Sequence, residues 1–295
     1  MKLKVTPGKY VAAISGGVDS VVLLDLLNRY LKDAKQNLVV AHYDHGIRPD
    51  SVGDREFVQQ IAKDYGLEFY YEDGKLGPNS SEALARRKRY EFLNRIKDKT
   101  DADAIVTAHH ADDILETMVI NVLRGTGRKG LSSLASRPGL ARPLLKFSKT
   151  DIIGYAHAHG LAWREDETNE DQTYLRNYVR HNVLKHLTEA QKKALLRIYG
   201  EAQSRNKEID GLINDLFFRQ DKMPRSLFNS LEHNLAREVV AGWLRKEKIS
   251  FDKETLDRLV VKLKTVRENK IIQASRGRYF TVSSKLIRMN TTRSV

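Results

Sequence analysis

The sequence contains no cysteine. This absence excludes disulfide bonds, thiolate zinc sites, cysteine-ligated iron–sulfur clusters and catalytic thiols. No window approaches the roughly 18 consecutive apolar residues of a membrane span, and the first ten residues lack the apolar core of a secretion signal. We therefore expect a soluble, cytoplasmic protein with no membrane partner.

The first two thirds of the sequence also carry little net charge. Residues 1–190 contain 28 basic and 26 acidic side chains, whereas residues 191–295 contain 23 and 12. A basic module attached to a balanced one suggests catalysis in the first part and binding of a polyanion by the second. A solvated basic surface without a partner explains the charge equally well.

Short apolar runs alternate with helical patterns in the first half of the sequence. The runs lie at 10–14, 38–42, 68–71 and 104–108, and the helical patterns at 20–31, 51–65, 80–97 and 112–123. Alternating strands and helices predict parallel strands with right-handed crossovers. The expected fold is an α/β, doubly wound, mostly parallel sheet that binds ligands at the carboxyl ends of its strands.

The second half reads as mainly helical. Helical patterns cover most of 149–187 apart from a polar loop at 165–172, a long helix is expected at 189–220, and two more at 233–247 and 252–266 precede short alternating runs near 271–274, 278–282 and 285–289. We predict two domains. Residues 1–200 form the catalytic domain with a helical extension, and residues 201–295 form a smaller, mainly helical α+β domain that carries the basic charge.

A glycine turn follows the first apolar run. It consists of Ser15, Gly16, Gly17, Val18, Asp19 and Ser20. Paired glycines permit positive φ and let backbone N–H groups turn toward an anion, while the start of the next helix adds unpaired donors and positive potential. The pattern is neither a Walker A loop nor a dinucleotide fingerprint. It predicts a phosphate-binding loop, with a plain tight turn as the alternative.

Two further strands end in polar residues. Period-two alternation puts His42 and Asp44 on one side of the second strand, and Asp113 and Glu116 lie three residues apart on one face of the helix that follows His109. Histidines and acids would thus converge near the phosphates. A transition-metal site would need the usual ligand spacing, which is missing. Alternatively, the histidines are packed at strand ends and the acids merely favour the helix start.

Together these motifs resemble those of the tRNA(Ile)-lysidine synthetases, a family within the N-type ATP pyrophosphatase, or PP-loop, superfamily. The matching segments follow the family's order: SGGVDS, HYDHGIR at 42–48, ARRKRY at 85–90, HHADDILET at 109–117, RGTG at 124–127, RPLL at 142–145, EDETN at 165–169, and Arg176-Asn177 with Arg180 beyond. They cover the first 185 residues almost continuously. Many members carry two appended domains, whereas this chain has room for one of roughly 100 residues, so the resemblance there is weak.

The resemblance implies an enzyme that uses ATP to ligate lysine to carbon 2 of the wobble cytidine in the CAU anticodon of an isoleucine tRNA. The reaction passes through an adenylated cytidine, releases AMP and pyrophosphate, and switches codon reading from AUG to AUA. The residues that the resemblance assigns to ATP are Ser15, Gly16, Gly17, Val18, Asp19, Ser20, His42, Asp44 and His45. Those that it assigns to catalysis are Asp19, Arg89, His109, Asp113 and Glu116.

The same resemblance suggests individual roles. Asp19 and Asp113 would hold magnesium, Arg89 would neutralise the α-phosphate, and His109 would act as a base or an orienting donor. Asp113 and Glu116 would also bind the cationic lysine, although their charges raise the pKa of its amine. The basic C-terminal part would grip the tRNA backbone through Arg267, Lys270, Arg276, Arg278, Lys285 and Arg288. The oligomeric state stays open, with a homodimer among the options.

Other enzymes share this type of loop. Transfer-RNA thiolases generally need cysteines, and GMP and asparagine synthetases add a glutamine-hydrolysing unit for which the chain has neither spare length nor a cysteine nucleophile. An ammonia-using synthetase and a non-enzymatic RNA-binding protein remain as alternatives. Pyrophosphate release that depends on both lysine and tRNA would separate the three.

Overall fold

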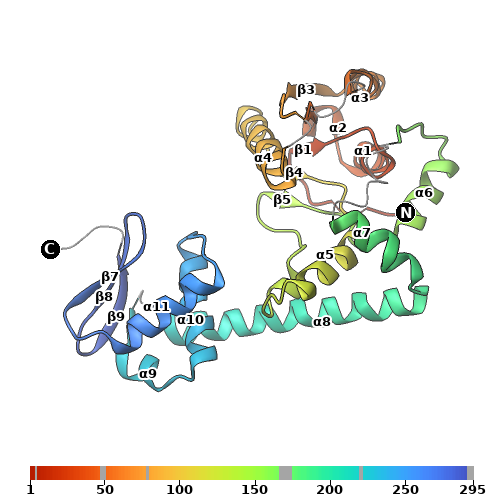
Figure 1. Cartoon of the computed structure of the whole chain (residues 1–295). Coiled ribbons are helices and arrows are strands. Elements are labelled where there is room, and N and C mark those ends of the chain that lie inside the picture. Colours follow the sequence, from red (N-terminus) through yellow and green to blue (C-terminus); the bar gives the residue numbers. More distant parts are fainter. Residues whose placement is uncertain (4, 47–50, 78–79, 166–174, 219–221, 291–295) are drawn as a thin grey trace. The chain divides into compact units, whose positions relative to one another are not determined.

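In a computed structural model of the chain, the described residues are 1–3, 5–46, 51–77, 80–165, 175–218 and 222–290. The chain divides into two compact units, Met1–Ala202 and Gln203–Val295 (Figure 1). None of the helices in the described part is long and apolar enough to cross a membrane.

The first unit is built on a five-stranded parallel sheet. Its strands are β1 (Tyr10–Ala13), β2 (Leu38–Asp44), β3 (Glu68–Asp73), β4 (Ala104–Val106) and β5 (Leu140–Ala141). Their spatial order is β3-β2-β1-β4-β5, and every neighbouring pair is parallel. The predicted doubly wound parallel sheet is therefore confirmed. The chain runs from β1 toward β2 on one side and returns to β4 on the other, so the strand order reverses between β1 and β4, where such folds bind ligands.

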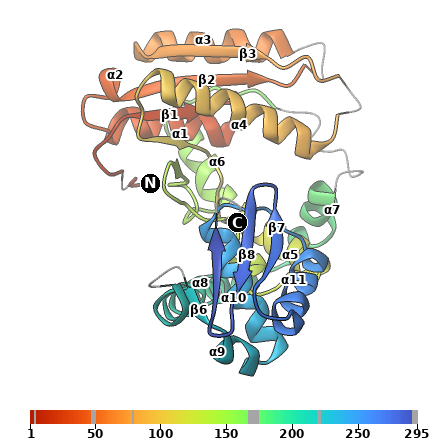
Figure 2. The ribbon, with the colours of Figure 1, turned by 90° about the vertical axis from the view of Figure 1, so that its left-hand side faces the viewer.

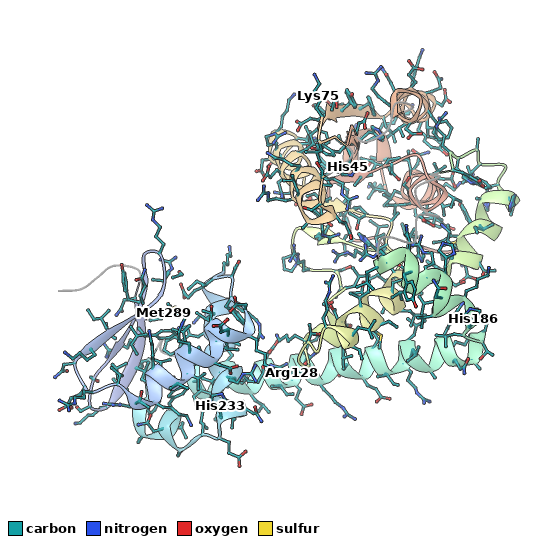
Figure 3. All side chains as sticks on the ribbon, viewed as in Figure 1. His45, Lys75, Arg128, His186, His233 and Met289 are labelled. Carbon is teal, nitrogen blue, oxygen red and sulfur yellow. The ribbon has the colours of Figure 1, made fainter. Side chains whose placement is uncertain are left out.

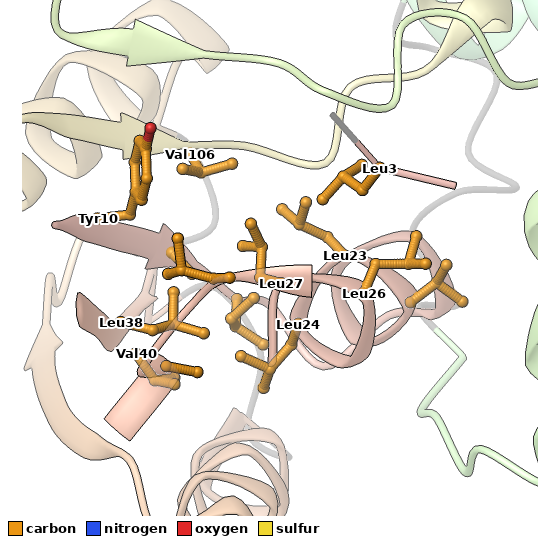
Figure 4. Packing of buried hydrophobic residues seen from close by; sticks show 14 of the residues in the cluster. Leu3, Tyr10, Leu23, Leu24, Leu26, Leu27, Leu38, Val40 and Val106 are labelled. Carbon is orange, nitrogen blue, oxygen red and sulfur yellow. The ribbon is translucent and has the colours of Figure 1, made fainter. Parts of the chain in front are cut away.

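Helices cover both faces of this sheet. The helices that begin in this unit are α1 (Val18–Tyr30), α2 (Ala34–Asn37), α3 (Ser51–Tyr65), α4 (Glu82–Lys99), α5 (Ala111–Leu123), α6 (Lys149–Ala158), α7 (Leu175–Asn182) and α8 (Glu189–Ile213). Leu24 and Leu27 of α1 pack with Val40 of β2 on one face (Figure 4). Phe92 of α4 packs with Val39 on the other face. Because β1 and β2 are buried on both faces, their sequences are almost continuously apolar.

The second unit is a small α+β fold, as predicted. Its strands β6 (Lys222–Pro224), β7 (Lys270–Ser275), β8 (Arg278–Val282) and β9 (Leu286–Asn290) form an antiparallel sheet of order β6-β9-β8-β7 (Figure 2). Its helices after α8 are α9 (Arg225–Ser230), α10 (His233–Lys246) and α11 (Lys253–Thr265). Trp243 and Phe280 are fully buried in its core, with ring centroids 5.5 Å apart.

Candidate active site

The predicted phosphate-binding loop links β1 to the amino end of α1. Gly16 adopts a φ of +96°, which a residue with a Cβ rarely reaches, whereas Gly17 has a φ of −70°. The Ser20 hydroxyl accepts hydrogen bonds from the N–H groups of Ser15 (3.2 Å) and Gly16 (3.1 Å) and donates to the carbonyl of Gly17 (2.8 Å). Gly17, the N-cap residue of α1, has no side chain that could accept hydrogen bonds from the first N–H groups of the helix. The first N–H groups of α1 are therefore suited to an anion.

The end of β2 lies beside this loop. His42 is buried, and its Nδ1 donates to the carbonyl of Ile14, 2.9 Å away, next to the loop. Burial lowers the pKa of His42, so its ring is neutral at pH 7. Asp44 instead shapes the following turn, where its Oδ1 accepts from the N–H of Gly46 (2.7 Å). His45, labelled in Figure 3, packs edge-on against Tyr43 at 5.1 Å between ring centroids. Ile47 and Arg48 of the same motif lie outside the described residues.

Three carboxylates surround His110 at the end of β4. The ring nitrogens lie 3.8 Å from Oδ1 of Asp19, 3.5 Å from Oδ2 of Asp112 and 3.6 Å from Oδ2 of Asp113. Burial alone would lower the pKa of His110, but these acids outweigh it and raise the pKa. The backbone N–H of His110 also donates to Asp113 (2.8 Å), which fixes the start of α5. The structure thus brings Asp19 and Asp113 together, with a histidine between them that was not among the predicted site residues.

A lysine that the sequence analysis missed contacts this acidic group. Nζ of Lys149 lies 2.7 and 2.8 Å from the two carboxylate oxygens of Asp19, and the backbone N–H of Lys149 donates to Oδ2 of Asp112 (2.7 Å). Burial opposes ionisation of Asp112, but the nearby ring of His110 and the hydrogen bond from the backbone of Lys149 outweigh it and lower its pKa to about 2. The sequence around Lys149 contains one recognisable local pattern. It is the capping box between Ser148 and Asp151, which begins α6 at Lys149.

Glu116 has different surroundings from Asp113. It is only 1% exposed, and Arg180 of α7 places Nε 2.7 Å from its Oε1. Nε of Arg176 lies 3.6 Å from the other oxygen, Oε2. Burial raises the pKa of Glu116, and the arginines only partly oppose that shift. The carboxylate of Glu116 therefore already has basic partners in this structure.

A group of arginines lies near the predicted catalytic histidine. His109 is hydrogen-bonded through Nδ1 to the hydroxyl of Thr107 (2.8 Å). Burial lowers its pKa to about 3, and the positive charges that add to this shift belong to Arg142, Arg89, Arg86 and Arg176. Burial and the neighbouring Arg86 and Arg176 also lower the pKa of Arg89. This excess of positive charge favours binding of an anion such as a phosphate.

The residues present fit magnesium better than a transition metal. In the described part of the chain, no group of three or more His, Asp or Glu side chains could hold a metal ion by itself. Magnesium usually takes only one or two carboxylates and completes its shell with phosphate oxygens and water. The carboxylate of Asp19, 30% exposed at the end of the phosphate loop, has the chemistry for this role.

The predicted RNA-binding residues lie on the sheet of the second unit and its connections. Lys270, Arg278 and Arg288 are strand residues, Arg276 lies between β7 and β8, and Lys285 lies between β8 and β9. Nε of Arg278 is 3.7 Å from a carboxylate oxygen of Glu247. Arg267 lies between α11 and β7.

The first unit combines a parallel sheet with a glycine loop at the point of strand reversal, a group of acids around His110 and a group of arginines near His109. This combination is typical of an α/β protein that binds phosphate groups. The PP-loop domain model matches residues 2–187, and the chain belongs to this family.

The chain is similar to curated tRNA(Ile)-lysidine synthases. It is 33% identical over 264 residues to the one from Thermotoga sp. (strain RQ2), covering 81% of this chain and 61% of the relative. It is 39% identical over 209 residues to one from Thermus thermophilus, covering 68% of this chain and 40% of the relative. The resemblance noted from the motifs is thereby confirmed, although the chain spans only about 40 to 61% of the length of these relatives.

A solved structure shares the fold. The U34-tRNA thiolase NcsA from Methanococcus maripaludis, solved with its [4Fe-4S] cluster, matches with a TM-score of 0.53 and 20% identity over 68% of this chain and 73% of that one. At this identity the match supports the fold alone.

Proposed function

We propose that this chain is a tRNA(Ile)-lysidine synthetase that uses ATP, magnesium and free lysine to convert the wobble cytidine of a CAU anticodon to lysidine. The observation that carries the proposal is the placement of Asp19, Asp112 and Asp113 within 3.8 Å of one histidine, beside the phosphate loop. The names of the relatives support the same substrate. The proposed setting is the cytoplasm, and the proposal allows a homodimer.

In the first step, the cytosine O2 attacks the α-phosphate and the bond to pyrophosphate breaks. The N–H groups of the loop and of α1 bind the phosphates of ATP, and Arg89 neutralises charge that develops at the α-phosphate. Asp19 would hold magnesium, and the charge of that ion would offset the charge of the departing pyrophosphate. His42, which is neutral, and His45 line the end of β2 beside the nucleotide.

In the second step, the lysine ε-amine displaces AMP from carbon 2. Forming the free amine at pH 7 costs about 4–5 kcal/mol, because its pKa in water is near 10.4. With a pKa of about 3, His109 is a weak base for this proton, so we assign it the role of an orienting hydrogen-bond partner. Because the carboxylate of Glu116 already pairs with Arg176 and Arg180, we propose that Asp113 contacts the lysine ammonium directly. Glu116 contributes by positioning Arg176 and Arg180 and joins the lysine site when those arginines move.

The second unit is proposed to bind the tRNA backbone. Phosphate contacts from its basic sheet would supply affinity without sequence specificity. Specificity would come from groups that contact unstacked anticodon bases, as in other proteins that recognise RNA loops.

The test is direct. The protein is incubated with ATP, magnesium, lysine and an isoleucine tRNA with a CAU anticodon, and the tRNA is digested and analysed by mass spectrometry. The expected product is one cytidine that has gained the mass of lysine minus water, with AMP and pyrophosphate released in equal amounts. A methionine tRNA with the same anticodon is the matched control and should stay unmodified. Release of ADP and orthophosphate, or no lysine on any cytidine, contradicts the proposal.

A further inference from the structure

Arg142 is a buried arginine that directly follows β5, and it is only 7% exposed. Its backbone N–H donates to the hydroxyl of Ser136 (2.9 Å), and Nη1 of its guanidinium donates to the carbonyl of Ala135. The strand before it pairs with β4, which leads to His109. These contacts fix Arg142 at the edge of the sheet that carries the candidate active site.

The guanidinium of Arg142 forms no ion pair with a carboxylate of any described residue. The side chains that act on it most strongly are Tyr90, which carries a hydroxyl, and the positive Arg86 and Arg137. Its Nε is buried and makes no hydrogen bond within the part of the chain that the structure describes. Burial of a charge costs free energy unless the charge is paired. An anionic ligand would remove this cost.

A purely structural role does not explain this arginine. Arg180, in contrast, pairs its Nε with the carboxylate of Glu116 at 2.7 Å. In Arg142 the hydrogen bond to Ala135 uses Nη1, which leaves the edge formed by Nε and Nη2 to hold two oxygens of one anion. A neutral amide side chain could donate the bond to Ala135 without the cost of a buried charge. The unpaired edge therefore indicates an anion-binding residue.

The positive charge around His109 exceeds what the α-phosphate of ATP can neutralise. Among the charged groups that act on His109, Arg142 has the largest effect, and Arg89 and Arg86 follow. None of these three arginines forms an ion pair with a described carboxylate. The α-phosphate, which we assign to Arg89, carries a single negative charge. The arginine group can therefore bind a second anion beside ATP.

The proposed reaction supplies such an anion. The cytosine O2 must reach the α-phosphate, so the wobble nucleotide has to leave the base stack and enter the site with its backbone. A negatively charged phosphodiester lies on each side of that nucleotide. We propose that Arg142 binds one of these two phosphodiesters and thereby holds the cytosine against ATP. The inference rests on the proposed function for its RNA substrate.

The test combines a protein variant with an uncharged phosphate, in the full chain and the isoleucine tRNA. The tRNA is ligated from two pieces so that a neutral methylphosphonate replaces the phosphodiester on the 5′ or the 3′ side of the wobble cytidine. Arg142→Gln should weaken binding of the unmodified tRNA about 10- to 100-fold, as expected for loss of a charge-assisted contact. One of the two neutral linkages should weaken wild-type binding similarly and cause little further loss in Arg142→Gln.

Magnesium ATP is the second probe, measured by isothermal calorimetry. Its affinity should be the same for Arg142→Gln and the wild type, which also shows that the variant is folded. Arg142→Lys keeps the charge but not the planar fork, so its tRNA affinity should lie between the two. The matched control is Lys146→Gln on the same segment, where the exposed ammonium lies 4.9 Å from the ring centroid of Phe147. This control should change neither affinity.

Three results overturn the inference. They are unchanged tRNA binding by Arg142→Gln, weaker binding of magnesium ATP by this variant, and a full additional loss with both neutral linkages. The lysidine assay of the wild type is run in parallel. Lysidine formation without coupling between Arg142 and a neutral linkage refutes the inference alone. Absence of lysidine refutes the proposed function, whereas coupling in that case still supports a contact between Arg142 and an RNA phosphate.

Discussion

The two units of this chain bury different kinds of side chain. In the first unit, the buried polar and charged residues include Asp25, His42, Asp44, His110, Glu116 and Arg142. In the described part of the second unit only Asn206 is such a residue, and the core is formed by side chains such as Trp243 and Phe280. Burying polar groups costs free energy unless they are paired, so their concentration marks the unit that carries chemistry. The basic excess of the second unit lies outside its core.

Not every buried acid belongs to the site. Asp25 accepts hydrogen bonds from the hydroxyls of Tyr65 (2.9 Å) and Tyr155 (2.7 Å) and pairs with Arg29 (2.7 Å). These partners come from α3, α6 and α1, so Asp25 joins three helices on one face of the sheet. It differs from Asp19 in exposure, because the side chain of Asp25 is only 3% exposed whereas that of Asp19 is 30% exposed.

The largest predicted effect tests the apolar core of the second unit. Trp243→Ala should destabilise the second unit by roughly 3–5 kcal/mol, because it leaves a cavity against Phe280. Hydrogen exchange followed by mass spectrometry should show lost protection in residues after Gln203 and unchanged protection in the parallel sheet. Leu235→Ala, on the same helix but 47% exposed, is the control and should change little. Equal loss of protection in both units would show that they do not fold independently.

The next largest effect tests the buried polar site of the first unit. Asp19→Asn keeps the shape of the side chain but removes its charge, and it should slow pyrophosphate release roughly 100- to 1,000-fold. The melting temperature should stay within about 2 °C of the wild type, because the Asp19 ion pair is partly exposed. Wild-type rates from Asp19→Asn would remove this residue from the reaction.

The sequence predicted the fold of the first unit well, because strands buried on both faces are almost continuously apolar. It missed β5 and β6, which have two and three residues and too little pattern to recognise. The long helix predicted at 189–220 ends as an α-helix at Ile213 and continues as a single π-helical stretch, Asn214–Phe218.

The site was predictable where its residues are neighbours in sequence. Ser15 to Ser20 form one turn, so their types and order suffice. Lys149 and Arg142 reach the site only through tertiary packing, and neither stands in a local pattern that indicates its partner. Likewise, the spacing of residues in the sequence could not predict that Glu116 pairs with Arg180, which is 64 residues away.

A smaller effect depends on pH. The pKa of His109 is lowered from 6.5 to about 3 by burial and the nearby arginines, so the folded protein keeps it neutral where the unfolded chain is protonated. Stability should therefore fall as the pH drops below 6.5, by at most about 1.4 kcal/mol per pH unit from this group. Urea unfolding between pH 6.5 and 5 should show a shallower decline for His109→Gln. The same slope in both proteins would mean that His109 is protonated when folded.

The smallest effect tests whether the charge of the second unit acts on RNA. Each lysine or arginine that contacts a phosphate releases counterions, so its removal should lower the salt dependence of binding, log Kobs against log [salt], by about 0.7 to 0.9. Arg276→Ala, in the turn between β7 and β8, should show this change and weaken tRNA binding by a few-fold. Arg278→Ala should do less, because the guanidinium of Arg278 already lies near Glu247. Lys63→Ala, on the exposed face of α3, is the control in the first unit. If only Lys63→Ala changed the salt dependence, the RNA backbone would bind the first unit. The proposal that the first unit catalyses and the second binds RNA would then be wrong.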